Sequence, residues 1–92
     1  MASLFIFIDM FKVYILYSKT LNRYYVGYTN DLNRRISEHN RKKRKYTDQG
    51  IPWQLVYIEE YFLKEEAMQR EKEIKKQKSR QFIEQLIKSS AG

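Results

Sequence analysis

Three short stretches of the chain, residues 12–17, 24–27 and 54–62, are dense in β-branched and aromatic residues. Such residues fit the pleated, half-buried surface of a strand. The segment between the first two stretches is polar and contains Asn22, a residue that forms turns readily. The pattern therefore predicts a β-hairpin followed by a third strand, which together make a small sheet.

After the second strand, the residues at helical spacing are Leu32, Ile36 and His39. Asn30 and Asp31 precede these residues and are good helix-capping residues. We therefore expect the second strand to break at Gly27 and the chain to continue directly into a helix. Residues 64–78 are helical by composition, and Ser79 begins a last helix. We expect an α+β fold with a single domain at residues 10–88 and a frayed end at 89–92.

The edge of the first helix carries two candidate functional residues. At about 100° per residue, Arg35 and His39 lie one turn apart at the rim of the apolar stripe, whereas Arg34 points to solvent. A cation at such a rim is held by packing and can still reach a ligand. The alternative is a solvated helix shoulder, in which charged side chains only cover the core with their stems.

Two tyrosines and a glycine are candidates on the sheet. Alternation places Tyr14 on the face opposite Val13, while Tyr25 and Gly27 share a face of the second strand. Tyr14 and Tyr25 can thus line the same side. Gly27 leaves space where the chain turns toward the helix, as glycine does where another group approaches the backbone closely.

A basic run follows the first helix and consists of Arg41, Lys42, Lys43, Arg44 and Lys45. Apolar periodicity is lost from residue 41 to Pro52, so we expect a loop. The run is either a solvated segment or a contact for the phosphate backbone of a nucleic acid. Tyr46 and Trp53 flank the loop; they could stack on bases, although Trp53 fits better as a core or hinge residue.

Glu71 stands among apolar positions on the helix at 64–78, whereas the other acids of that helix fall on its solvent side. Burying a carboxylate is costly, so Glu71 implies either a buried basic partner or a bound cation. Together with Arg35 and the two tyrosines, it would supply a metal ligand, a phosphate clamp and proton acceptors. Those are the parts that phosphodiester hydrolysis needs.

Composition narrows the classes of function. The chain has 92 residues, with 18 Lys and Arg against 11 Asp and Glu for a net charge of +7. A single domain of this charge favours a polyanionic partner, either nucleic acid or an acidic membrane surface. The chain has no cysteine and one histidine, which excludes thiolate zinc sites, cysteine nucleophiles and sites built from several imidazoles. Any metal must rely on oxygen ligands.

The apolar stretch at residues 4–17 is too short for a membrane span and is interrupted by Asp9 and Lys12. It also lacks the basic region and the small-residue cleavage site of a signal peptide. We therefore expect a cytoplasmic protein outside the membrane. Residues 1–9 form an N-terminal extension that either lengthens the first strand or packs loosely.

Several of these residues occur in a recurring order along the chain, namely Val13-Tyr14-Ile15, Tyr25-Val26-Gly27, Arg35, and Ala67 with Glu71. In this order they resemble the GIY-YIG nucleases, over nearly the whole of residues 10–87. The likeness is greatest to small stand-alone bacterial members, related to the nuclease domain of excision-repair proteins. It extends to structure-specific nucleases whose helix also reads Arg-Arg followed by His-Asn. Two positions depart from the pattern. Lys12 stands where the first signature of the family, Gly-Ile-Tyr, begins with glycine, and His39 stands where some members have a tyrosine.

This resemblance implies a three-stranded antiparallel sheet flanked by helices and an endonuclease that cleaves nucleic acid, DNA more than RNA, with DNA repair as a setting. It also implies one divalent ion, Mg²⁺ or Mn²⁺, held by Glu71. Arg35 would stabilise charge at the scissile phosphate, and Tyr14 or Tyr25 would activate the attacking water. His39 would orient the groups at the site or relay a proton between them. A free tyrosine has a pKa of about 10, so the base needs help from the metal or from Arg35.

Three interpretations stay open on the sequence alone. The first is a metal-dependent endonuclease with little sequence specificity and a preference for nucleic-acid structure or single strands. The second is a catalytically weak nucleic-acid-binding module of the same fold. The third is an accessory that binds a protein partner through exposed aromatic residues, which a large apolar surface patch would favour. The tyrosine, arginine and glutamate set favours the first, because binding alone needs no inward carboxylate.

Overall fold

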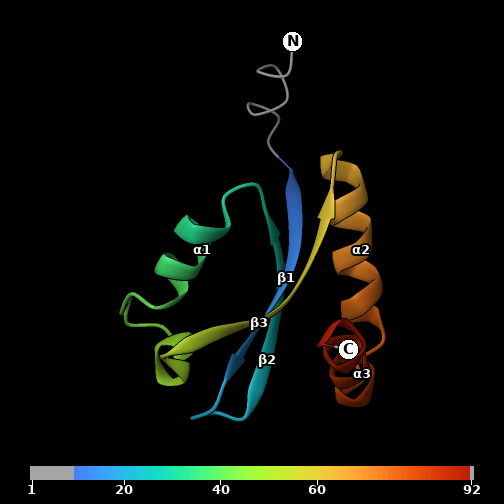
Figure 1. Cartoon of the computed structure of the whole chain (residues 1–92). Coiled ribbons are helices and arrows are strands. Elements are labelled where there is room, and N and C mark those ends of the chain that lie inside the picture. Colours follow the sequence, from blue (N-terminus) through green and yellow to red (C-terminus); the bar gives the residue numbers. More distant parts are fainter. Residues whose placement is uncertain (1–9, 92) are drawn as a thin grey trace.

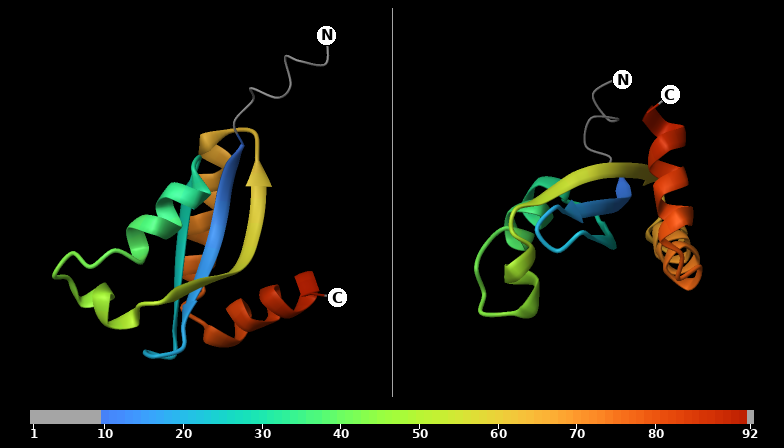
Figure 2. Two further views of the ribbon diagram at one scale, coloured as in Figure 1. Left: turned by 60° about the vertical axis from the view of Figure 1, so that its left-hand side comes forward. Right: turned by 90° about the horizontal axis from the view of Figure 1, so that it is seen from below.

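The computed structural model describes residues 10–91, and the predicted extension at 1–9 lies outside that part. The elements are β1 (Phe11–Ser18), β2 (Arg23–Thr29), α1 (Leu32–His39), the 3-10 helix η2 (Tyr46–Gly50), β3 (Trp53–Tyr61), α2 (Lys64–Lys76) and α3 (Arg80–Ala91). The strands form one antiparallel sheet in the order β2-β1-β3. Helix α1 lies on one face, and α2 and α3 lie on the other (Figure 1 and Figure 2). The predicted α+β class is confirmed.

Strand β1 takes the centre of the sheet because it is apolar on both faces. Its four middle residues are at most 1% exposed. Val13 and Ile15 pack toward α2 and α3, whereas Tyr14 and Leu16 pack toward α1. The core is therefore divided into two thin layers by the sheet, and α1 and α2 approach the same strands from opposite sides.

The register of the hairpin brings the candidate residues together. Tyr14 pairs with Gly27 and Leu16 pairs with Tyr25, so Tyr14 and Tyr25 share the α1 face as predicted. Asn22 forms the turn in the left-handed region, with φ 53°. Strand β2 does not break at Gly27 but continues to Thr29. Within residues 10–91, β2 pairs only with β1, so Gly27 lies at a free edge of the sheet.

The helices differ from the prediction in three places. The stretch expected to be loop contains η2, because the Asp48 carboxylate accepts backbone hydrogen bonds from residues 43–45 and closes a turn. Helix α2 ends at Lys76, ahead of Lys78, whose φ of 47° is left-handed. Helix α3 continues to Ala91, past the predicted end of the domain at residue 88. In the described part of the chain, every helix is too short or too polar to cross a bilayer.

Candidate active site

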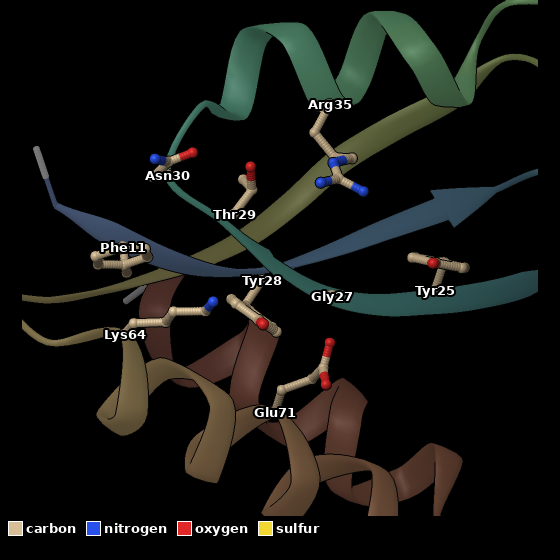
Figure 3. Close-up of a pocket in the computed structure, with 9 residues that line it drawn as sticks. All are labelled: Phe11, Tyr25, Gly27, Tyr28, Thr29, Asn30, Arg35, Lys64 and Glu71. Carbon is tan, nitrogen blue, oxygen red and sulfur yellow. The ribbon is translucent and has the colours of Figure 1, made fainter.

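A polar pocket of about 500 Å³ opens at the free edge of β2, beside Gly27. Arg35 reaches the pocket from α1 on one face of the sheet, and Glu71 reaches it from α2 on the other (Figure 3). The remaining lining residues are Phe11, Tyr25, Tyr28, Thr29, Asn30 and Lys64. Because Gly27 has no side chain, two oppositely charged groups share one hollow across the edge of the sheet.

Arg35 enters the pocket because the cap of α1 sets the phase of the helix. The Asp31 side chain accepts a hydrogen bond from the backbone N–H of Arg34 at 3.1 Å. The Arg34 guanidinium turns outward, where it pairs with Glu38 at 3.1 Å and its side chain is 58% exposed. The Nε of Arg35, in contrast, is buried and has no hydrogen-bond partner within residues 10–91. Buried donors are normally satisfied, so this group is available to an acceptor from outside the described chain.

Glu71 faces the pocket from α2, one turn beyond the buried Ala67. Its side chain is 17% exposed, and its carboxylate lies 3.5 Å from the Nζ of Lys75, whose side chain is 53% exposed. The partner is therefore a lysine that reaches solvent rather than a base enclosed in the core. A lysine of this kind can leave when another cation approaches, since water can hydrate its ammonium group.

Tyr14, Tyr25 and His39 form a cluster beside the pocket. The hydroxyl of Tyr14 lies 3.1 Å from Nε2 of His39, and the His39 ring centroid lies 4.4 Å from that of Tyr25. Burial raises the pKa of Tyr14, and the neighbouring Tyr25 adds to the rise. Burial, with the nearby charges of Lys43 and Arg35, lowers the pKa of His39. At neutral pH the imidazole is therefore neutral, and Nε2 can accept the proton of Tyr14.

Gly27 is required for space at this position. A Cβ atom there would lie 2.5 Å from the Tyr14 hydroxyl oxygen and 2.7 Å from Cζ of the same ring. The φ of Gly27 is not positive, so its backbone conformation is open to other residues. Tyr14 is only 1% exposed and is not among the residues that line the pocket; its hydroxyl occupies the space beside Gly27 that a side chain would need.

One group beside the site was missed in the sequence. Arg70 donates to the carboxylate of Glu59 on β3 through Nε at 2.9 Å and Nη2 at 3.1 Å, and the hydroxyls of Tyr57 and Tyr61 also donate to it. Burial opposes ionisation, but these hydrogen bonds outweigh it and lower the pKa of Glu59. Arg70 precedes Glu71, so this clamp helps to set the rotation of α2 that presents Glu71. In the sequence, the signal for this clamp was Glu59 between Tyr57 and Tyr61 on one face of a predicted strand.

The basic run at 41–45 does not line the pocket, although Lys43 is close enough to influence His39. Its backbone is ordered around Asp48, whose Oδ2 accepts from the N–H groups of residues 43, 44 and 45 at 2.8, 2.6 and 3.3 Å. Although desolvation acts the other way, these hydrogen bonds lower the pKa of Asp48. The side chains of the run are exposed except for the half-buried Lys43. The run is therefore a fixed, solvent-facing cationic loop.

Trp53 anchors this loop to α1 and is a core residue, as expected. It is 5% exposed, and its backbone N–H and C=O bond the side-chain amide of Asn40 at 2.6 and 3.0 Å. Its indole Nε1 donates to the carbonyl oxygen of Thr47 at 3.0 Å. Tyr46 is 56% exposed and lies under the guanidinium of Arg23.

The donor set at Glu71 fits one hydrated divalent ion. Among residues 10–91, no three His, Cys, Asp or Glu side chains are grouped to hold a metal. Glu71 supplies one carboxylate in a polar pocket with room for water. Mg²⁺ keeps several water ligands and is commonly bound by one or two carboxylates together with substrate phosphate. This pocket therefore suits Mg²⁺ and offers too few ligands for a closed metal cage.

An arginine, a glutamate and two tyrosines thus surround an edge glycine, in the order along the chain that resembles the GIY-YIG pattern. The model of the GIY-YIG catalytic domain matches residues 10–84, and the chain belongs to the GIY-YIG family. GIY-YIG nucleases act on nucleic acid and generally use a divalent metal.

Within this family, the chain is similar to small bacterial proteins named UPF0213. It is 41% identical to the UPF0213 protein YazA of Bacillus subtilis (strain 168) over 68 residues, which are 70% of this chain and 69% of that protein. It is 44% identical over 64 residues to a UPF0213 protein of Streptococcus pneumoniae serotype 4, covering 68% of this chain and 65% of the relative. The solution NMR structure of the UPF0213 protein BH0048 from Bacillus halodurans superposes with a TM-score of 0.57 at 36% identity, covering 90% of this chain and 87% of that one.

Proposed function

We propose that this protein is a metal-dependent endonuclease that hydrolyses phosphodiester bonds of DNA in the pocket beside Gly27. One observation carries the proposal: Arg35 and Glu71 enter this pocket from opposite faces of the sheet, and the Nε of Arg35 has no hydrogen-bond partner in the described chain. A phosphate oxygen would satisfy that donor. The same phosphate would lie beside a carboxylate suited to Mg²⁺ or Mn²⁺.

The tyrosine and histidine pair provides a route for the proton of the attacking water. A free tyrosinate at Tyr14 is unfavourable, because burial raises the pKa of its hydroxyl. As water gives its proton to the Tyr14 oxygen, the Tyr14 proton can pass to Nε2 of His39, 3.1 Å away. Tyr14 then stays neutral and His39 becomes the imidazolium. Tyr25, whose ring packs against both groups, holds them in place.

Arg35 stabilises the negative charge that grows on the phosphate oxygens during the displacement, from a position that packing has already set. A divalent ion at Glu71 would add positive charge at the same phosphate and lower the pKa of bound water. Lys75 would leave the Glu71 carboxylate to make room for that ion. The leaving oxygen takes its proton from solvent.

The cationic loop at 41–45 extends the contact to the DNA backbone outside the pocket. We assign Arg41, Lys42, Lys43, Arg44 and Lys45 to phosphate contacts, which position a nucleic acid without reading its sequence. Selection of substrate by structure rather than by sequence follows from such contacts. A cytoplasmic role in DNA repair is consistent with this activity.

One observation favours the second candidate, a binding module with little turnover: Lys75 already neutralises Glu71 within the chain. Incubation with branched, flapped, single-stranded and duplex DNA and RNA, with Mg²⁺, Mn²⁺ or chelator, separates the two. For the endonuclease, Glu71→Gln abolishes cleavage and leaves nucleic-acid affinity unchanged or slightly stronger, because one repulsive carboxylate is gone. The solvent-facing Glu73→Gln is the matched control and should cleave normally.

Thermal melts complete this comparison. Mg²⁺ should raise the melting temperature of the wild type and not that of Glu71→Gln, since only a native carboxylate that binds the ion links metal to stability. If Mg²⁺ leaves the melting temperature of the wild type unchanged and the Glu71→Gln variant melts at a far lower temperature, Glu71 belongs to an ion pair. That result would favour the binding module.

A further inference from the structure

Two smaller hollows continue the active-site pocket along the free edge of β2. The second hollow, about 290 Å³, includes Tyr24, Tyr25, Lys75 and Lys78 in its lining, and the third, about 260 Å³, includes Arg23, Tyr24 and Lys78. Tyr25 lines both the pocket and the second hollow, and Tyr24 with Lys78 lines both the second and the third. The three therefore form one groove between β2 and α2, which we call the β2–α2 groove.

The lining of the β2–α2 groove is cationic. Glu71 is its one acidic residue, against six basic residues, which are Arg23, Arg35, Lys64, Lys75, Lys78 and Arg80. Neither Lys64 nor Lys78 forms an ion pair within residues 10–91. Figure 3 shows the Lys64 side chain extending along the pocket from the start of α2, on the side of Gly27 away from Tyr25. Cations therefore flank Glu71 in both directions along the groove.

Aromatic rings complete the groove. Tyr24, Tyr25 and Tyr28 line it from β2, and Phe11 adds a ring beside Lys64. A basic channel with aromatic side chains is the surface that tracks a nucleic-acid backbone while bases or sugars rest on rings. The groove is thus distinct in composition from the cationic loop at 41–45, none of whose residues lines the three hollows.

We propose that the β2–α2 groove binds the sugar-phosphate backbone of one nucleic-acid strand on both sides of the cleavage point. Lys64 contacts phosphates on one side of Glu71, and Lys75 and Lys78 contact them on the other. Helix α2 is about 18 Å long from residue 64 to residue 76, at about 1.5 Å per residue, and Lys78 lies just beyond its end. This length corresponds to about five nucleotides at roughly 3.4 Å per nucleotide. The inference rests on the proposed function for the position of the cleavage point. The contacts between the groove and the strand are argued independently of that function.

The groove also gives Lys75 a role beyond its ion pair. Lys75 lines the second hollow while its Nζ lies 3.5 Å from Glu71. When a cation replaces it at the carboxylate, its free ammonium group is already placed beside the strand. Metal binding and strand binding then support each other through this one side chain.

A salt-dependence experiment in chelator tests the groove without catalysis. The paired variant Lys64→Ala/Lys78→Asn removes one cation at each end; asparagine is chosen because it tolerates the left-handed φ of residue 78. The matched control is Lys72→Ala/Lys76→Ala, which removes the same charge from exposed positions of α2 outside all three hollows. Affinity is measured by fluorescence anisotropy against a labelled 12-nucleotide strand, alone and in a duplex, over a range of salt concentrations.

We expect the groove variant to lower the slope of log affinity against log salt by about 1.4 on the single strand and about 1.8 on the duplex, which is two contacts at about 0.7 or 0.9 each. The control should keep the wild-type slope. Equal slopes for the two variants would overturn the inference, because charge would then act diffusely. A wild type that binds through the groove but does not cleave with Mg²⁺ refutes the proposed function alone, whereas cleavage with control-like slopes refutes the groove alone.

Discussion

Gly27→Ala tests whether the edge glycine holds the cluster of Tyr14, Tyr25 and His39 together. The new Cβ would lie 2.5 Å from the Tyr14 hydroxyl oxygen, where an ordinary contact is 3.4–4 Å, so the phenol has to move by about 1 Å. Tyr14 is 1% exposed and fixed by His39 and Tyr25, which leaves little room to move. Overpacking of this kind costs about 1–3 kcal/mol. In a domain of this size, each kcal/mol lowers the melting temperature by about 4–8 °C.

The same displacement affects activity. A movement of about 1 Å disturbs the 3.1 Å contact between the Tyr14 hydroxyl and Nε2 of His39, because hydrogen bonds depend on distances and angles set to a few tenths of an ångström. A misplacement of that size can cost about 100-fold in rate. Thermal or urea unfolding and cleavage of a fixed substrate are measured on the same preparations.

A double-mutant cycle identifies the contact responsible. In a Tyr14→Phe background the hydroxyl oxygen is absent and the nearest contact becomes Cζ at 2.7 Å, so Gly27→Ala should cost less stability there than in the wild type. Tyr14→Phe alone is the control. A Gly27→Ala protein that melts and cleaves like the wild type would refute both the packing of Tyr14 against Gly27 and the proton route through it.

Three further outcomes are expected. Arg35→Ala should reduce cleavage by about 100-fold to 1,000-fold while the solvent-facing Arg34→Ala stays near wild type, and equal rates would contradict the assignment of Arg35. Because the pKa of His39 is lower folded than unfolded, stability should fall as pH drops from about 6.5 to the folded value, and His39→Gln should remove that part of the pH profile in urea titrations. A stability–pH profile that is unchanged in His39→Gln would mean that a group other than His39 titrates. Replacing residues 42–44 by alanine should reduce the slope of log affinity against log salt by about 0.7–0.9 per lost contact. An unchanged slope would show that the loop is solvated and does not contact phosphates.

The sequence alone determined the parts of this protein that depend on local periodicity. The distinction between Arg34 and Arg35 follows from about 100° of rotation per residue, and the shared face of Tyr14 and Tyr25 follows from strand alternation with a short turn. The inward position of Glu71 was predictable for the same reason. In each case, neighbours in sequence fix the direction of the side chain before any tertiary contact forms.

Only the tertiary structure decided what those side chains meet. The hydrogen bond between Tyr14 and His39 joins residues 25 positions apart, and the clamp between Glu59 and Arg70 joins a strand to a helix. The position of Gly27 at a free edge depends on the strand order β2-β1-β3, which no local pattern encodes. The pKa shifts of the cluster arise from burial, and burial is a property of packed layers rather than of sequence neighbours. A local pattern thus sets which way a residue points, while the packing of distant segments sets its partner, its solvation and its chemistry.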